Sequence, residues 1–243
     1  MGPRRKLDLY GPREENEKPL PVVVFFYGGA WNSGSRTHYG FAARALAAMG
    51  YLVVVPDYRL VPEIEYPAFL KDCAAAAAWV GEHIAAYGGD PERLVLAGHS
   101  AGAYNAACLA LDPRWLAPAL RSAIVGVIGL SGPYDFYPFD GPISQRVFGE
   151  ADNPRQTQPI NHVGPDAAPM LLITGGRDRL VLPRNSVNLS AALERAGVPD
   201  RLRLYPRLGH AGILFCLSLP LRWRAPVLED CRAFLAEVTN PGM

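Results

Sequence analysis

The feature that most constrains this chain is the regular alternation of short apolar runs with longer helical patterns. Six runs rich in β-branched and other apolar residues lie at 21–27, 51–56, 93–98, 123–131, 169–176 and 201–206. Most of these runs are almost wholly apolar, which is typical of strands in a parallel sheet that is covered on both faces. A further run at 6–11 alternates apolar and polar residues and predicts an edge strand. The alternation predicts an α/β fold with a mostly parallel, doubly wound sheet and helices on both faces.

Three longer segments carry helical patterns. Segments 183–198 and 225–238 are predicted helices, and Gly197 is expected to end the first of them. Segment 67–89 is a third, expected to end at the glycine pair 88–89. Its predicted buried stripe is Phe69, Cys73, Ala76, Val80 and Ile84. With no internal repeat and no linker, residues 1–243 are expected to form a single domain.

Composition and charge argue against several classes of function. The net charge is +1 and the arginines are scattered, so no nucleic-acid partner is expected. The opening segment has no apolar core for a signal peptide, and no apolar run is long enough to span a bilayer. The cysteines show no metal-ligand spacing, so reduced thiols in a cytoplasmic protein are expected, although a disulfide is not excluded. They are Cys73, Cys108, Cys216 and Cys231.

The segment 96–103, LAGHSAGA, places Ser100 between two glycines directly after a predicted strand and before a predicted helix. Glycines remove the Cβ atoms that would clash in a sharp strand-to-helix turn. The helix N-terminus behind the serine favours developing negative charge. Although an ordinary glycine-rich junction is the alternative, the context predicts that Ser100 is a nucleophile.

A serine hydroxyl needs a base to take its proton and an acid to orient that base. Asp178 follows the predicted strand 169–176, and His210 follows the next strand, so the chain order is Ser, acid, His. Asp135 also follows a strand and is the alternative acid, although Asp178 is preferred.

The other histidines are expected to have different places. His99 is expected to point away from the site and to be structural. His38 and His83 are expected at the surface, and His162 is a candidate for the pocket wall.

The reaction also needs hydrogen-bond donors for the oxyanion that forms at the carbonyl. The backbone amide of Ala101, after the nucleophile, is one candidate. The glycine turn 27–31, YGGAW, follows an earlier strand and is expected to supply the others. Its small residues would let the backbone approach the substrate.

Residues 132–168 do not follow the alternation of strands and helices. They are rich in Pro, Gly, Asp and Asn and follow the carboxyl end of a predicted strand, where α/β sheets bind ligands. This segment is therefore predicted to be an irregular lid or pocket-covering insertion. The substrate-binding candidates beside the motifs are Trp31, Tyr104, Phe136 and Ile213, each of which is about as well explained as a core residue.

Taken together, the motifs YGGAW, PDYRLVPE, YGGDPERLVLAGHSAGA, LSGPYDF, GGRDRLV and GHAG resemble the α/β-hydrolase superfamily. The nearest likeness is to its serine carboxylesterases of the hormone-sensitive-lipase and feruloyl-esterase-like kind, and it covers about residues 20 to 215. The resemblance implies that Ser100, Asp178 and His210 form the catalytic triad. It implies that the amides of Gly29, Ala30 and Ala101 form the oxyanion hole.

The chain departs from this family in two respects. The usual turn reads His-Gly-Gly-Gly, whereas Tyr27 and Ala30 stand in place of its first and last residues. Since the donors are backbone groups, a working oxyanion hole is still expected. The N-terminal cap of related esterases has no counterpart, so the cap is expected to be minimal and the pocket open.

These observations predict hydrolysis of small, short-acyl esters through an acyl-enzyme, without a metal or an organic cofactor. The expected partner is a small-molecule ester, and a homodimer is left open. An arylformamidase-like amide hydrolase is the nearest alternative, because it would use the same residues. A hydrolase fold that only binds ligands or proteins is another alternative, though the complete triad disfavours it.

Overall fold

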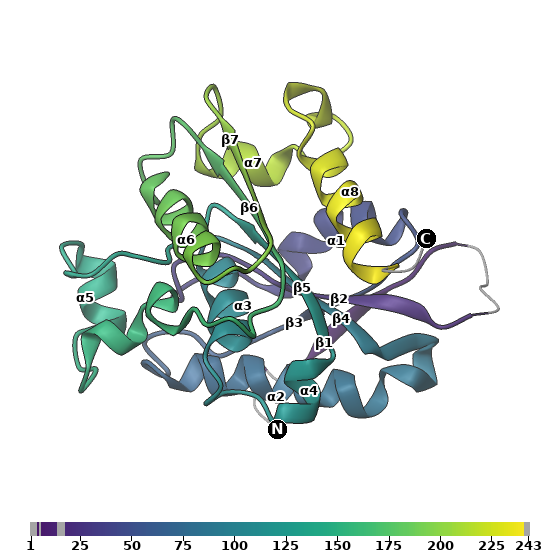
Figure 1. Cartoon of the computed structure of the whole chain (residues 1–243), viewed down its shortest axis with the longest axis horizontal. Helices are drawn as coiled ribbons and strands as arrows, with labels where there is room; N and C mark the ends of the chain where they lie inside the picture. The colour runs from purple at the N-terminus through teal and green to yellow at the C-terminus, as the bar shows by residue number, and fades with distance from the viewer. Residues whose placement is uncertain (1–3, 5, 14–17, 241–243) are drawn as a thin grey trace.

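Seven strands form one continuous sheet at the centre of the protein (Figure 1). The computed structural model describes residues 4, 6–13 and 18–240. The sheet order is β1-β3-β2-β4-β5-β6-β7, and every neighbouring pair is parallel except β1 with β3. The strands are β1 Leu7–Tyr10, β2 Leu20–Phe26, β3 Leu52–Pro56, β4 Gly89–His99, β5 Ile124–Leu130, β6 Met170–Gly175 and β7 Asp200–Tyr205. The predicted α/β fold and the edge strand are therefore confirmed, while the expectation of no signal peptide falls partly outside the described residues.

Helices cover both faces of the sheet. In Figure 1, α1 (Gly40–Ala47) and α8 (Val227–Thr239) lie on one side, and α2 (Ala68–His83) and α3 (Ala101–Leu111) lie on the other. The remaining helices are α4 Pro118–Ser122, α5 Pro142–Phe148, α6 Arg184–Arg195 and α7 His210–Phe215. None of the helices in the described ranges is long and apolar enough to cross a membrane.

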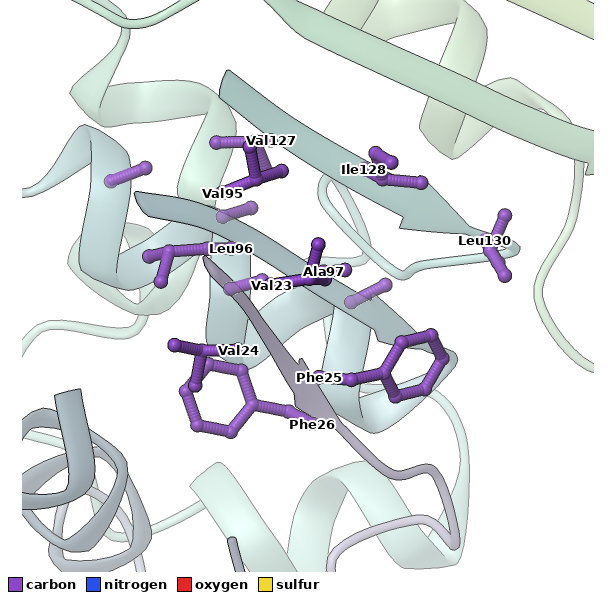
Figure 2. Close-up of a cluster of buried hydrophobic side chains, with 14 of the residues drawn as sticks. Val23, Val24, Phe25, Phe26, Val95, Leu96, Ala97, Val127, Ile128 and Leu130 are labelled. Carbon is purple, nitrogen blue, oxygen red and sulfur yellow. The ribbon is translucent and has the colours of Figure 1, made fainter. Parts of the chain in front are cut away.

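The central strands pack their side chains against one another and against both helical layers. Figure 2 shows Val23 and Phe25 of β2 beside Val95 and Ala97 of β4, and all four are at most 1% exposed. Burial on both faces explains why these strands have no polar alternation. The four cysteines are buried free thiols within this core, so the structure contains no disulfide among them.

Helix α2 departs from its prediction in two details. Its buried stripe passes through Ala77, which is 1% exposed, while Ala76 is only partly buried. A 3-10 turn, Ile84–Tyr87, continues the helix, and Gly88 ends that turn with a φ of 80°. Gly89 is the first residue of β4 rather than part of the helix end. The sheet takes over the chain there because Leu20 pairs with Gly89.

The excursion 132–168 is more ordered than the sequence suggests. It contains α5 and two 3-10 turns, Pro154–Thr157 and Pro159–His162. Asn185 of α6 accepts hydrogen bonds from the amides of Tyr134 and Asp135, both at 2.9 Å. Polar side chains elsewhere in the fold thus replace the strand pairing that the excursion lacks. The prediction that this segment is irregular was wrong for Pro142–Phe148, which form α5.

Candidate active site

Ser100 occupies a strained turn between β4 and α3. Its φ is 56° and its ψ is −122°, a conformation that a residue with a side chain adopts only when its surroundings enforce it. A Cβ on Gly98 would lie 2.3 Å from the backbone of Gly102, and one on Gly102 would lie 2.0 Å from the carbonyl oxygen of Phe26. The two glycines are therefore required by close packing rather than for flexibility.

Asp178 and His210 meet at the carboxyl ends of β6 and β7. The Nδ1 of His210 lies 2.7 Å from Oδ2 of Asp178, whose side chain is fully buried. The other carboxylate oxygen accepts hydrogen bonds from the amides of Leu180 at 3.0 Å and Val181 at 2.9 Å. The loop thus holds the carboxylate in a single orientation, with one oxygen for the backbone and one for the imidazole.

The protonation of Asp178 follows from these contacts. Burial raises the pKa of its carboxyl, but hydrogen bonds from His210, Val181 and Leu180 and the charge of His210 outweigh that effect. The pKa therefore lies below its usual value, and the group is ionised at neutral pH. An ionised carboxylate accepts the Nδ1 proton of His210 and leaves Nε2 free to act as a base.

Asp135, the alternative acid, lies in a different environment. Its Oδ2 accepts a hydrogen bond from Nδ2 of Asn188 at 2.6 Å, and its amide donates to Asn185. These contacts tie the start of the excursion 132–168 to α6. The structure brings Asp178, and not Asp135, to His210.

His99 lines the pocket and contacts His210, so the expectation that it points away from the site was wrong. Its ring centroid lies 4.8 Å from that of His210, and its Nε2 lies 3.3 Å from the carbonyl oxygen of His210. Because a carbonyl only accepts, Nε2 must carry the proton, and Nδ1 then accepts from the hydroxyl of Tyr39 at 3.0 Å. Burial, with a contribution from His210, lowers the pKa of His99 to about 3, so the ring is neutral.

The glycine turn after β2 has an unusual backbone. Gly29, Ala30 and Trp31 have φ values of 136°, 52° and 57° in succession. The carbonyl of Gly29 accepts hydrogen bonds from the amides of Asn32 at 3.1 Å and Ser33 at 2.9 Å. The amides of Gly29 and Ala30 themselves have no acceptor within the described part of the chain. They are available to a substrate.

Tyr27, which replaces the family's histidine, is part of the core. Its ring stacks on Tyr58 with centroids 4.5 Å apart, and the hydroxyl of Tyr58 donates to the carbonyl of Tyr27 at 2.7 Å. The stacked rings and this hydrogen bond hold the first residue of the turn in place. Tyrosine at this position is therefore compatible with the backbone geometry that follows.

Asn105 is a second residue whose role the sequence did not indicate. It is fully buried in α3, and its Oδ1 accepts a hydrogen bond from the indole Nε1 of Trp31 at 3.1 Å. The carbonyl of Trp31 in turn accepts from the amide of Val61 at 2.8 Å. Asn105 and Val61, from two distant segments, thus hold Trp31, the last residue of the glycine turn. A lone asparagine inside an apolar helix was the only signal in the sequence.

The predicted nucleophile, base and oxyanion donors line one pocket of about 920 Å³, while Asp178 is buried beside His210 and lies outside the lining. Its lining includes Ser100, His210, Gly29, Ala30 and Ala101. The excursion 132–168 contributes Pro133, Phe136 and residues 140–144 to the wall. The loop that follows Asp178 contributes residues 179–182.

The predicted substrate-binding residues divide into two groups. Trp31 and Phe136 line the pocket. Tyr104 and Ile213 are fully buried and lie outside the lining, so they belong to the core. His162 also lies outside the pocket lining. Its Nε2 lies 2.8 Å from the carbonyl of Gln156 in the neighbouring 3-10 turn.

Comparison with known proteins places this geometry in context. Residues 7–193 match the family model described as BD-FAE. The chain is 30% identical to a probable isoprenylcysteine alpha-carbonyl methylesterase of Oryza sativa subsp. japonica, with 94% of this chain and 60% of that protein covered. It is also 30% identical to esterase LipC of Mycobacterium tuberculosis, over 74% of this chain and 49% of that protein. The chain thus spans about half to three fifths of these relatives.

A solved structure shows the same architecture over nearly the full length. Esterase 2 of Thermogutta terrifontis, phosphoramylated by tabun, superposes with a TM-score of 0.83 at 25% identity. The match covers 96% of this chain and 89% of that protein. A propionate-bound form of the same esterase has a TM-score of 0.82. The fold is therefore that of the α/β hydrolases, as the sequence predicts.

Proposed function

The chain belongs to the BD-FAE family of α/β hydrolases, and from that premise we propose that it hydrolyses small, short-acyl carboxylic esters. The observation that carries the proposal is the meeting of three strand ends at one pocket. Ser100 lies in a strained turn there and lines the cavity, as does His210. Asp178 is hydrogen-bonded to His210 and lies beside the cavity. Relatives named as esterases and methylesterases support it.

The proposed reaction is a two-step acyl transfer. Nε2 of His210 takes the proton of the Ser100 hydroxyl as its oxygen attacks the ester carbonyl. The oxyanion accepts hydrogen bonds from the amides of Gly29, Ala30 and Ala101. His210 then gives its proton to the leaving alcohol, and water attacks the acyl-enzyme by the same route. None of these steps requires a metal or an organic cofactor.

The proposed substrate size rests on the limited cover of the pocket, and its apolar wall suits an acyl group. Trp31 and Phe136 offer an apolar surface, and their rings lie 6.4 Å apart between centroids. Residues 132–168 are proposed as the main cover of the pocket, and the described residues contain no larger lid. The propionate bound to the Thermogutta esterase is a short acid of the expected kind. A cytoplasmic location and a homodimer stay predictions, to be checked by cell fractionation and by sedimentation.

The test compares kcat/KM for p-nitrophenyl acetate, butyrate, octanoate and palmitate. We expect the short esters to be hydrolysed fastest and Ser100→Ala to lose at least about 10³-fold. Ser122→Ala is the matched control, because this serine lies on α4 and its hydroxyl bonds only the carbonyl of Pro118. Maximal turnover of palmitate would overturn the substrate size. Turnover by Ser100→Ala at the wild-type rate would overturn the mechanism.

A second assay separates ester hydrolysis from the two alternatives. A fluorophosphonate probe should label Ser100 in the wild type, and peptide mass spectrometry identifies the labelled residue. An absence of labelling would favour a binding protein. An N-formylated aromatic amine turned over faster than the acetate ester would favour an amide hydrolase instead.

A further inference from the structure

Two neighbouring segments carry several arginines and contain no exposed acidic side chain of their own. Residues 176–184 and 206–224 contain six arginines and a single acidic residue, in a chain with 24 basic and 23 acidic side chains. That acidic residue is Asp178, which is fully buried against His210. The six arginines are exposed, and none forms an ion pair within the described ranges. They are Arg177, Arg179, Arg184, Arg207, Arg222 and Arg224.

The same two segments contain the three most exposed large apolar side chains of the described residues. Leu180 is 81% exposed, Trp223 is 79% exposed and Leu219 is 78% exposed. The Nε1 of Trp223 donates to the carbonyl of Pro220 at 3.0 Å, so the indole is held by its own loop rather than by the core. A tryptophan beside arginines and leucine is the composition of surfaces that enter the headgroup layer of a membrane.

The two segments lie side by side where each begins, and these beginnings reach the edge of the pocket. The amide of Gly176 donates to the carbonyl of Tyr205, and the amide of Arg177 donates to that of Leu208, both at 2.9 Å. Figure 1 shows the loop after β7 and the segment between α7 and α8 at the top of the view. Arg179 and Leu180 line the pocket together with His210.

From this arrangement we propose that residues 176–184 and 206–224, the basic–apolar face, dock on an anionic phospholipid surface. The arginines would contact lipid phosphates, and Trp223, Leu219 and Leu180 would enter the boundary between headgroups and acyl chains. A nucleic acid offers the phosphates but no apolar layer for the two leucines. Docking would turn the mouth of the pocket toward the lipid, so that esters dissolved there reach Ser100. Only this last consequence rests on the proposed function.

The test is co-sedimentation of the full chain with vesicles. One set contains phosphatidylcholine alone, and the other contains about 30 mol% phosphatidylglycerol. We expect binding to the second set, little binding to the first, and a clear loss of binding at high salt. Equal binding to both sets, or no binding to either, would overturn the proposal.

Variants outside the pocket show whether this face is responsible. Arg222→Gln with Arg224→Gln should weaken vesicle binding by roughly 25-fold, since each arginine near an anionic surface contributes about fivefold. Leu219→Ser with Trp223→Ala should weaken it further. Arg195→Gln, at the end of α6, is the matched control and should bind as the wild type does. Hydrolysis of soluble p-nitrophenyl acetate should be the same in all these variants, which reports the proposed function separately.

Two further outcomes would count against the proposal. If the arginine variants bind vesicles as tightly as the wild type, the charge argument fails. If analytical ultracentrifugation shows a dimer that Leu219→Ser with Trp223→Ala dissociates, the apolar residues are covered by a second copy of the chain.

Discussion

Replacing Asp178 by asparagine tests the proposed mechanism at the point where the structure makes the sharpest statement. Oδ1 of Asp178 accepts two backbone hydrogen bonds, from Leu180 and Val181. In Asp178→Asn the amide oxygen must remain at that position, because both partners are donors. The new NH₂ group therefore faces Nδ1 of His210, where the carboxylate oxygen accepted a proton at 2.7 Å. The imidazole is forced to carry its proton on Nε2, the atom that should take the proton of Ser100.

The expected loss in kcat is about 10⁴-fold, the size typical of this substitution in a Ser-His-Asp mechanism. It corresponds to about 5.5 kcal/mol of lost transition-state stabilisation. The fold should survive, since the loop keeps both of its backbone hydrogen bonds. Steady-state rates with p-nitrophenyl acetate measure the loss, and thermal unfolding shows that the variant is folded.

Asp135→Asn is the matched control. This residue also follows a strand of the sheet, but it accepts from Asn188 and does not reach His210. We expect a loss of less than about tenfold, caused by altered packing of the excursion 132–168. The reasoning is refuted if Asp178→Asn loses less than about tenfold while folded, or if Asp135→Asn loses as much as Asp178→Asn.

Three other predictions concern the packing around the elbow, the strained turn at Ser100 between β4 and α3. Gly102→Ala should lower the free energy of unfolding by about 3 kcal/mol or more, because its Cβ would lie 2.0 Å from the carbonyl oxygen of Phe26. Gly164→Ala is the control: it has open space around it and should be near neutral in chemical denaturation. Asn105→Leu leaves the indole of Trp31 without its acceptor and should lower kcat about tenfold and the melting temperature by several degrees. The pKa of His99 is about 3 in the folded chain and near 6.5 in the unfolded chain, so the unfolded chain binds more protons between these values. Wild-type stability should therefore increase as the pH rises from about 3 to about 6.5, and it should increase less in His99→Gln, as urea midpoints would show.

The parts of the fold set by local pattern could be predicted from the sequence. Almost wholly apolar runs marked the central parallel strands β2, β3 and β6, most of whose residues are buried. The elbow was predictable because the glycines, the serine and the following helix lie in one continuous segment. The closeness of Asp178 and His210 followed from topology, since the carboxyl ends of the adjacent parallel strands β6 and β7 meet at one edge of the sheet.

Contacts between distant segments could not be predicted in this way. The hydrogen bond from Trp31 to Asn105 spans 74 positions, and the contact from His99 to the carbonyl of His210 spans 111. Nothing in the local sequence of either pair requires the other. Both pairs depend on where the helices and loops come to rest on the sheet, which is decided by packing over the whole core.

The pocket wall shows why nearness in sequence misled the choice of substrate-binding residues. Tyr104 lies four residues after Ser100 and Ile213 three after His210, so each is one helical turn beyond a residue that lines the pocket. All eleven residues of α3 are buried, and α7 packs Ile213 into the core, so neither helix offers a second pocket-facing position one turn on. The wall comes instead from two segments that follow other strands, residues 140–144, which include the start of α5, and residues 179–182. Changes in substrate preference should therefore arise from substitutions in these two segments rather than beside the catalytic residues.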